Sequence, residues 1–239
     1  CLLSYIEVNS RQELIIVATC GCSDKGCEDE ERFTRMYRYL PSGKIDRTFG
    51  DSGVADGSLG YEPRRIKIDE NDDIIVSGST AKRFEEHLFV AKYSDAGEEL
   101  WISDDQELEE GTEGQSILID EDGNIIVAQD TGLDLDDSGT NRQLIIWKMN
   151  DTGTLIENFG TNGRLEPRGY MTGMPMVVDS RNRITTNVNT ASMPLNGEAR
   201  ILRYSARGVL DESFGGGKGR IDMNKACDTD FRNVVAYTG

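Results

Sequence analysis

Apolar residues recur along this chain in short strand-like patterns that are separated by polar turns. Within residues 64–80, Ile66 and Ile68 alternate with polar residues, and a more continuously apolar stretch begins at Ile74 after a polar turn. Alternation of apolar and polar positions predicts a half-buried β-strand. The continuous stretch predicts a second strand that is buried on both faces. Together the two patterns predict a β-hairpin.

The hairpin pattern occurs four times in the sequence. The first residue of the second predicted strand aligns in every copy, with one extra residue in the turn of the first copy; these residues are Ile15, Ile74, Ile125 and Ile184. A second landmark follows, a residue that ends the third predicted strand and a Gly four positions later. These pairs are Tyr39 and Gly43, Tyr93 and Gly97, Met149 and Gly153, and Tyr204 and Gly208. Two landmarks that stay in step predict a tandem repeat of roughly 55 residues, with the Gly in a tight turn that needs positive φ.

Each repeat predicts four antiparallel strands with an apolar face, which cannot stand alone and must stack on its neighbours. The sequence therefore predicts an all-β fold, a β-propeller built from four-stranded antiparallel blades, with four full repeats plus the first strand of a fifth. A β-solenoid-like stack is the alternative. The predicted blades span residues 1–60, 61–111, 112–170 and 171–227, with a partial blade at 228–239. We expect residues 1–239 to form a single repeat domain that is a segment of a larger propeller.

The segments that follow the hairpins resemble a known repeat family. Residues 36–53 (MYRYLPSGKIDRTFGDSG) and 203–223 (RYSARGVLDESFGGGKGRIDM) are similar to the delta-60 repeat of bacterial proteins. The second repeat departs most from the pattern, because it lacks the Phe-Gly pair and places Trp101 near the equivalent Phe. The resemblance implies propeller blades in an exported or cell-surface protein. It implies no shared enzymatic activity and no site residues.

The chain is strongly acidic. It carries 26 Lys and Arg against 43 Asp and Glu, which gives a formal net charge of −17. Such a charge repels nucleic acid and anionic membrane surfaces and attracts cations or basic partners. No run approaches the roughly 18 apolar residues that a membrane-spanning helix needs. We therefore expect no nucleic-acid partner and no membrane span. The expected partners are other blades, copies of the chain itself, or a protein or glycan ligand.

Five cysteines indicate a disulfide framework in an exported protein. They are Cys1, Cys20, Cys22, Cys27 and Cys227. Either Cys20 or Cys22 is expected to pair with Cys27 in a local loop. Cys1 and Cys227 precede equivalent first strands, so they could meet only if the chain ends come together. The expected location is extracellular or at the cell surface.

One loop has the composition of a calcium site. In residues 134–141 (DLDDSGTN), oxygen-bearing side chains stand at alternate positions, as in the first half of a calcium-binding loop. The candidate ligands are Asp134, Asp136, Ser138 and Thr140. The bidentate Glu of such a loop is absent, and Ile145 stands in its place. Ca²⁺ is therefore the candidate cofactor. The alternative is a solvated acidic loop, because Asp-rich loops are common without a metal.

The sequence carries none of the motifs that mark serine hydrolases, zinc proteases or phosphate-binding loops. His87 is the only histidine and stands at the start of a predicted strand. The loops that follow the second and fourth strands of each repeat are long and variable and would gather on one face, where repeat proteins often bind ligands. The predicted function is a non-enzymatic extracytoplasmic module for binding or structural scaffolding. Two alternatives stay open: a subunit of an extracellular filament assembled by strand addition, and a propeller-type lyase or glycosidase.

Overall fold

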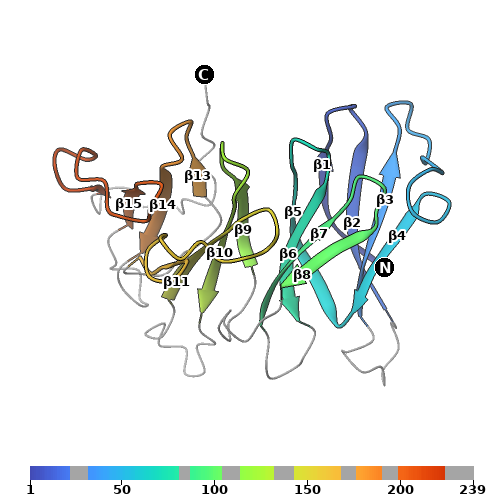
Figure 1. The fold of residues 1–239 in the computed structure, drawn as a ribbon, viewed down its shortest axis with the longest axis horizontal. Coiled ribbons are helices and arrows are strands. Elements are labelled where there is room, and N and C mark those ends of the chain that lie inside the picture. The colour runs from blue at the N-terminus through green and yellow to red at the C-terminus, as the bar shows by residue number, and fades with distance from the viewer. Residues whose placement is uncertain are drawn as a thin grey trace. The chain divides into compact units, whose positions relative to one another are not determined.

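The structure confirms an all-β fold. This computed structural model describes residues 1–21, 32–80, 87–103, 114–131, 143–167, 176–189 and 199–223. Its strands form four four-stranded antiparallel sheets, as Figure 1 shows. In every sheet the hydrogen-bonded order of the strands follows their order in the sequence. The predicted four-stranded antiparallel unit is therefore confirmed.

Each sheet corresponds to one repeat of the sequence. The first sheet consists of β1 (Leu2–Val8), β2 (Leu14–Cys20), β3 (Phe33–Tyr39) and β4 (Val54–Leu59). The second consists of β5 (Tyr61–Ile68), β6 (Ile74–Thr80), β7 (Leu88–Tyr93) and β8 (Glu99–Ser103). The third consists of β9 (Gly114–Ile119), β10 (Ile125–Thr131), β11 (Gln143–Met149) and β12 (Arg164–Leu165). The fourth consists of β13 (Met176–Val178), β14 (Ile184–Asn189), β15 (Ala199–Tyr204) and β16 (Arg220–Met223).

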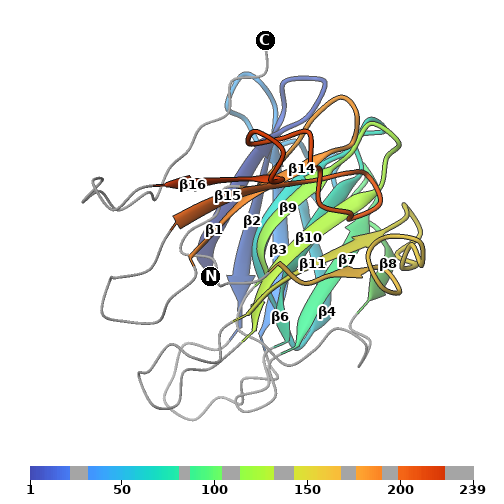
Figure 2. The ribbon, with the colours of Figure 1, turned by 90° about the vertical axis from the view of Figure 1, so that its left-hand side faces the viewer.

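The chain divides into two compact units, Cys1–Ile117 and Leu118–Gly239. Unit 1 holds the first and second sheets, coloured blue to green in Figure 1. Unit 2 holds the third sheet, apart from the first residues of β9, and the fourth sheet. Figure 2 shows β14, β15 and β16 of the fourth sheet side by side. Each unit is thus a pair of packed sheets.

The turn between the first and second strands is the same in all four sheets. The backbone N–H of its first residue donates to the carbonyl four positions later, in the pairs Asn9 and Glu13, Asp69 and Asp73, Asp120 and Asn124, and Asp179 and Arg183. The first copy therefore has no extra turn residue. Its second strand begins at Leu14, which pairs with Tyr39 as Ile74 pairs with Tyr93. The alignment through Ile15 is wrong by one residue, because Leu14 and Ile15 are both aliphatic and either one fits the apolar pattern.

Each sheet has two faces, because successive side chains of a strand point to opposite sides. We call the face that carries Leu14 in the first sheet and Ile74 in the second the front face, and the opposite one the back face. The back face of the first sheet, with Ile15 and Val17, packs against the front face of the second. The other buried residues of this core are Met36, Phe49, Ala55, Ile66, Val76, Phe89, Ala91 and Tyr93.

Unit 2 repeats this arrangement. Ile126 and Ala128 on the back face of the third sheet pack against Ile184 and Val188 on the front face of the fourth. The other buried residues of this core are Leu144, Ile146, Phe159, Met176, Leu202 and Tyr204. The two units therefore use equivalent positions of the repeat to join their sheets.

The prediction of a second strand buried on both faces holds for β6, in which all seven residues are buried. In β2 the burial is not continuous, since Leu14, Ile16 and Thr19 are only partly buried. Leu14 and Ile16 lie on the front face of the first sheet, beside Ile6 and Val8, which are 55 % and 48 % exposed. The same repeat position is therefore buried or exposed according to whether another sheet covers it.

The landmark glycines combine a positive φ with a close approach between sheets. The φ angles of Gly43, Gly97, Gly153 and Gly208 are 77°, 88°, 81° and 74°, which confirms the predicted tight turns. At Gly97, an added Cβ would lie 2.6 Å from the Ala55 Cβ and 3.0 Å from the Phe49 ring. At Gly208, an added Cβ would lie 3.2 Å from the Phe159 ring. In each unit, the glycine of the following sheet leaves room for the Phe of the preceding one.

Candidate functional site: a repeated cluster of cations and carboxylates

A cation stands at the same place in every third strand, directly before the residue that ends the strand. We call these four residues the cation column: Arg38, Lys92, Lys148 and Arg203. Arg38, Lys92 and Lys148 are at most 6 % exposed. An isolated charge at such depth would be strongly unfavourable, so each cation needs a partner of opposite charge. The carboxylates that supply this charge come from the turns between strands.

In unit 1, Arg38 is held by residues of both sheets. Its Nε lies 2.8 Å from Asp46 Oδ2. Its Nη1 lies 2.7 Å from the Asp95 backbone carbonyl and 2.8 Å from Asp95 Oδ1. The guanidinium also lies over the Phe49 ring, 4.9 Å from the ring centroid. Because Asp46 follows β3 and Asp95 follows β7, Arg38 joins the two sheets of the unit.

Asp72 forms a second link between the sheets of unit 1. Ser10 donates to it twice, from its backbone N–H at 2.8 Å and from its hydroxyl at 2.7 Å. The Arg11 guanidinium lies 3.1 Å from Asp72 Oδ2 and also pairs with Glu13 and Asp95. The first turn of the second sheet is thereby fastened to the first turn of the first sheet.

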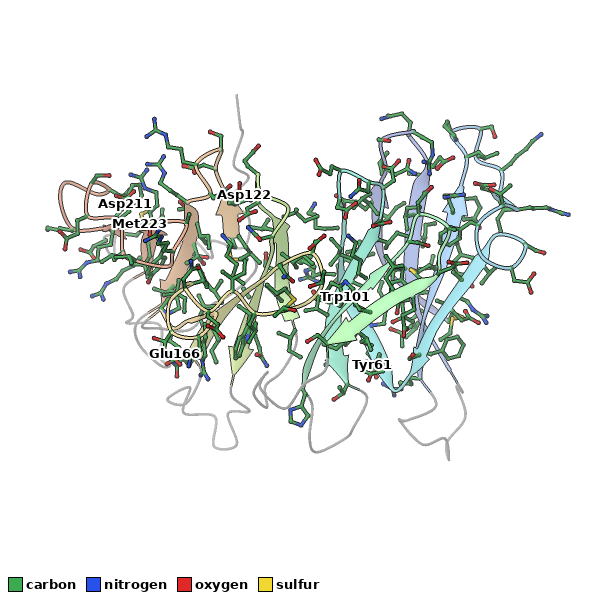
Figure 3. The ribbon with its side chains drawn as sticks, viewed as in Figure 1. Tyr61, Trp101, Asp122, Glu166, Asp211 and Met223 are labelled. Carbon is green, nitrogen blue, oxygen red and sulfur yellow. A yellow bond between two sulfur atoms is a disulfide. The ribbon has the colours of Figure 1, made fainter. Side chains whose placement is uncertain are left out.

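Lys92 is paired within its own sheet. Its Nζ lies 2.8 Å from Asp69 Oδ2 and 3.1 Å from Asp73 Oδ2. Burial opposes the charged ammonium, but the two carboxylates outweigh burial and raise the pKa of Lys92. Trp101, labelled in Figure 3, stands opposite Lys92 on β8. Lys92 therefore stays charged although it is buried on the back face of the second sheet.

Unit 2 carries the same joint with different residues. Lys148 Nζ lies 2.7 Å from Asp120 Oδ2, and the Asp120 side chain is fully buried. Asn182 occupies the position of Asp72, accepts the Glu121 backbone N–H at 2.9 Å and donates to Asp122 at 2.6 Å. Figure 3 shows Asp122 at the turn between β9 and β10.

The fourth sheet supplies the last pair of the cation column. Arg203 Nε lies 2.7 Å from Asp211 Oδ2, and Asp211 is labelled in Figure 3. The Arg203 guanidinium lies 4.5 Å from the centroid of the Phe214 ring, as Arg38 lies over Phe49. The pairing of cation, carboxylate and Phe is therefore shared by the first, third and fourth sheets, and the second sheet lacks the Phe.

Among the described residues, the carboxyl groups with clearly displaced pKa values are all shifted toward the ionised form. They are Asp46, Asp72, Asp120, Asp179 and Asp211. Hydrogen bonds from Thr48 lower the pKa of Asp46. At Asp120, burial acts to raise the pKa, but the Lys148 ammonium and hydrogen bonds from Asn124 outweigh it. A general acid that works near neutral pH needs the opposite shift. These clusters are therefore suited to holding sheets together.

The structure joins Cys1 to Cys20, which corrects the alternative that pairs Cys20 with Cys27, while the pairing of Cys22 with Cys27 stays a prediction. Cys20 is therefore not the partner of Cys27, and Cys1 is not the partner of Cys227. The antiparallel pairing of β1 with β2 brings the Cα atoms of Cys1 and Cys20 to 4.1 Å, although 19 positions separate them in the sequence. Spacing along the chain favours the local loop and cannot show this approach. Cys22, Cys27 and Cys227 lie outside the described residues.

The four candidate calcium ligands, Asp134, Asp136, Ser138 and Thr140, also lie outside the described residues. Within the described ranges, no group of three or more His, Cys, Asp or Glu side chains is placed to hold a metal ion. His87 is half-buried just before β7, and its backbone carbonyl accepts the Thr80 N–H at 2.8 Å. The calcium site stays a prediction.

The sequence predictions do not include the cation column, although its signal stands in the sequence. A Lys or Arg directly precedes each of the four residues that end a third strand. An alignment that follows only apolar landmarks passes over such a column, because a charged residue in a strand is normally assigned to solvent. In the part of the chain that the structure describes, no helix is long and apolar enough to cross a membrane.

Comparison with known proteins finds similarity in structure and none in sequence. No family model matches the sequence, and no curated protein is similar to it. One solved structure with a similar chain trace is CoXyl43, a GH43 β-xylosidase/α-arabinofuranosidase from a compost microbial metagenome, in complex with xylotriose and in a calcium-free form. The match covers 92 % of this chain and 89 % of that one, with 10 % identity and a TM-score of 0.41.

The prediction that the chain is not an enzyme is corrected by this comparison, because the similar structure is that of a glycosidase. That prediction depended on missing sequence motifs. Glycoside hydrolysis needs two carboxyl groups that the fold brings together, and no linear motif records such a pair. At this level of similarity the likeness assigns neither an activity nor a catalytic residue. What the described residues show is an all-β repeat fold of four four-stranded antiparallel sheets.

Proposed function

We propose that this chain is an extracytoplasmic, propeller-type repeat module whose sheets form a rigid scaffold for binding a protein or glycan ligand. The observation that carries the proposal is the cation column with its carboxylate partners. In unit 1, Arg38 donates to the Asp95 carbonyl and Asp72 accepts the Ser10 N–H, and both bonds fasten one sheet to the next. In unit 2, Asn182 accepts the Glu121 N–H and links the sheets in the same way. Polar networks whose groups are all satisfied make a fold rigid and unique.

The arrangement of the sheets as blades of a larger propeller is part of this proposal, and so is membership of the delta-60 repeat family. Support comes from the four equivalent sheets and from the Phe-Gly turn that follows the third strand. This turn occurs at Phe49–Gly50, Phe159–Gly160 and Phe214–Gly215. The second sheet lacks it, and β8 there begins soon after the turn at Gly97.

The disulfide between Cys1 and Cys20 supports a location outside the cytoplasm, because cytosolic thiols are kept reduced. Peptide mapping of the non-reduced protein, taken from the compartment in which it accumulates, should recover a peptide that contains both cysteines. Recovery of Cys1 and Cys20 as free thiols would contradict the proposed location.

The scaffold role is tested by a binding screen with the folded, oxidised chain. The chain is immobilised and exposed to an array of polysaccharide fragments and to purified cell-surface proteins, with the heat-unfolded chain as control. We expect saturable binding of at least one of them to the folded chain alone. Equal signals from the folded and the unfolded chain would contradict a scaffold that presents a defined surface.

Glycoside hydrolysis is the second candidate, as the propeller-type glycosidase among the alternatives. CoXyl43 is a β-xylosidase/α-arabinofuranosidase in complex with xylotriose, so xylotriose, aryl xylosides and aryl arabinofuranosides are the substrates to try. Release of sugar that is abolished by replacing a single carboxylate would establish an enzyme in place of a scaffold. An absence of release from every substrate would leave the scaffold proposal in place.

A further inference from the structure

Within each unit, two sheets meet through one repeated joint. In unit 1, the Phe49 ring lies against Gly97, and the Gly50 N–H donates to the Ala96 carbonyl at 2.9 Å. In unit 2, the Phe159 ring lies against Gly208, and the Gly160 N–H donates to the Arg207 carbonyl at 2.9 Å. A Phe-Gly pair on a back face thus fits a glycine turn on the next front face.

The front face of the first sheet has the receiving half of this joint, and it is exposed. Ile6 is 55 % exposed, whereas its equivalents Ile66 and Met176 are 6 % and 4 % exposed. Gly43 stands at the position of Gly97 and Gly208, has the same positive φ, and an added Cβ there would meet nothing within 4 Å. We call this surface the socket; its residues are Ile6, Val8, Leu14, Ile16, Ser42 and Gly43.

The back face of the fourth sheet has the inserting half. Phe214 is partly exposed, whereas Phe49 and Phe159 are fully buried at the equivalent position. Gly215 follows it with a φ of 62°, close to the 51° and 55° of Gly50 and Gly160. Ile221, which pairs with Ile201 on the back face, is 40 % exposed. We call this surface the plug; its residues are Asn187, Ile201, Phe214, Gly215 and Ile221.

One polar group of the socket fits the existing joints as well. The Ser42 carbonyl stands where Ala96 and Arg207 accept the glycine N–H in the two existing joints.

We propose that the socket binds the plug of a second copy of this chain, so that copies associate head to tail. The joint repeats the contacts within each unit: Phe214 lies against Gly43, and the Gly215 N–H donates to the Ser42 carbonyl. Pairing two sockets would leave Gly43 without a Phe, so a symmetric dimer does not use this chemistry. Such a head-to-tail contact produces a ring if the rotation closes and a filament if it does not. It packs faces and leaves the strand edges unpaired, which separates it from strand addition.

The test uses two charge substitutions at exposed apolar positions, with a matched control. Ile6→Glu blocks the socket and Ile221→Glu blocks the plug. Val209→Glu places the same charge at a residue that is 64 % exposed in a turn outside both surfaces. The oligomeric state is measured by light scattering coupled to size exclusion over a range of concentrations, and circular dichroism checks the fold of each variant. Because each copy carries a charge of −17, association should strengthen as salt is added.

The expected result is a mass that rises with concentration above the 26.5 kDa monomer for the unmodified chain and for Val209→Glu. Each blocking variant should associate at least about tenfold more weakly, because it buries a charge in an apolar joint. An equimolar mixture of the two blocking variants should form a dimer and nothing larger, because Ile6→Glu keeps its plug and Ile221→Glu keeps its socket.

Three outcomes would overturn the proposal. The unmodified chain could remain a monomer at every concentration, which would mean that no second copy binds. Ile221→Glu could still dimerise alone, which would mean that two sockets pair with each other. The mixture of the two variants could fail to form a dimer although both are folded, which would mean that the socket and the plug do not bind each other.

Discussion

The two units hold their sheets together with different chemistry in the same geometry. In unit 1, Asp72 accepts the Ser10 backbone N–H at 2.8 Å, and Arg11 balances the carboxylate. In unit 2, Asn182 stands at that position and accepts the Glu121 backbone N–H at 2.9 Å. The φ angles of the two acceptors are 63° and 58°. The joint therefore requires an oxygen acceptor in a left-handed turn. The negative charge of Asp72 in unit 1 is not required for this contact.

The cations of the two units differ in a second way. Arg38 distributes its charge over Asp46 and the partly exposed Asp95, which come from two sheets. Lys148 pairs with Asp120, whose side chain is fully buried. Loss of the cation should therefore be more damaging in unit 2, where water cannot reach the remaining carboxylate.

The largest effect is expected for Lys148→Met. It leaves Asp120 buried without its counter-charge and should lower the free energy of unfolding by about 3–5 kcal/mol. Urea unfolding followed by circular dichroism measures the loss. The double variant Lys148→Met with Asp120→Asn should recover most of it. Arg38→Met should cost less than Lys148→Met, and equal losses would contradict the difference between the units.

A smaller effect is expected at the landmark glycines. Gly43→Ala and Gly97→Ala both force a residue with a Cβ to a positive φ, which costs about 1 kcal/mol. Gly97→Ala also places a Cβ 2.6 Å from Ala55, and overpacking of this kind adds about 1–3 kcal/mol. Thermal unfolding of the two variants should therefore give clearly different midpoints. The same midpoint for both would show that the sheets of unit 1 do not meet at Gly97.

A still smaller effect shows whether the Asp72 side chain acts through its acceptor oxygen or through its negative charge. Asp72→Ala removes the partner of the Ser10 N–H and should cost about 1–2 kcal/mol. Asp72→Asn recreates the chemistry of Asn182 and should cost less than about 0.5 kcal/mol. Urea unfolding of the two variants in parallel compares them. A loss from Asp72→Asn as large as that from Asp72→Ala would make the charge, and not the oxygen, the essential feature.

The smallest effect concerns the stability of the fold at low pH. The folded pKa values of Asp46, Asp72 and Asp120 lie below the ordinary carboxyl value. Their contribution to stability is therefore present above the unfolded pKa of about 3.9 and is lost as the pH falls through the lower folded values. The midpoint of urea unfolding should decrease below about pH 4. In Asp72→Asn, the midpoint of urea unfolding should decrease slightly less steeply with falling pH. An unchanged slope would mean that Asp72 does not contribute to the loss of stability in acid.

The fold could be predicted from the sequence because the same pattern of apolar and polar positions recurs in every repeat. Periods of two, polar turns and a fixed Gly were enough to define four strands per repeat. The position of Leu14 was missed because two adjacent aliphatic residues fit the pattern equally well, and only the pairing with Tyr39 decides between them. Periodicity specifies strands and leaves a one-residue ambiguity wherever apolar residues are adjacent.

The candidate site was less predictable. The joints depend on contacts between residues that lie far apart in the sequence, such as Ser10 with Asp72 and Lys148 with Asp120. A charged residue next to an apolar landmark looks like a solvent-exposed residue until the strand is placed between two sheets. Composition shows that the chain is acidic, but it does not show which acids are engaged in the interior.

The disulfide between Cys1 and Cys20 has a consequence for the first strand. β1 is joined to β2 by a tight turn at one end and by the disulfide at the other. A hairpin closed at both ends cannot slide by two residues or exchange its outer strand with another molecule without first breaking a covalent bond. In an oxidising environment the alignment of β1 is therefore permanent once formed, and reduction would return the strand to ordinary fraying.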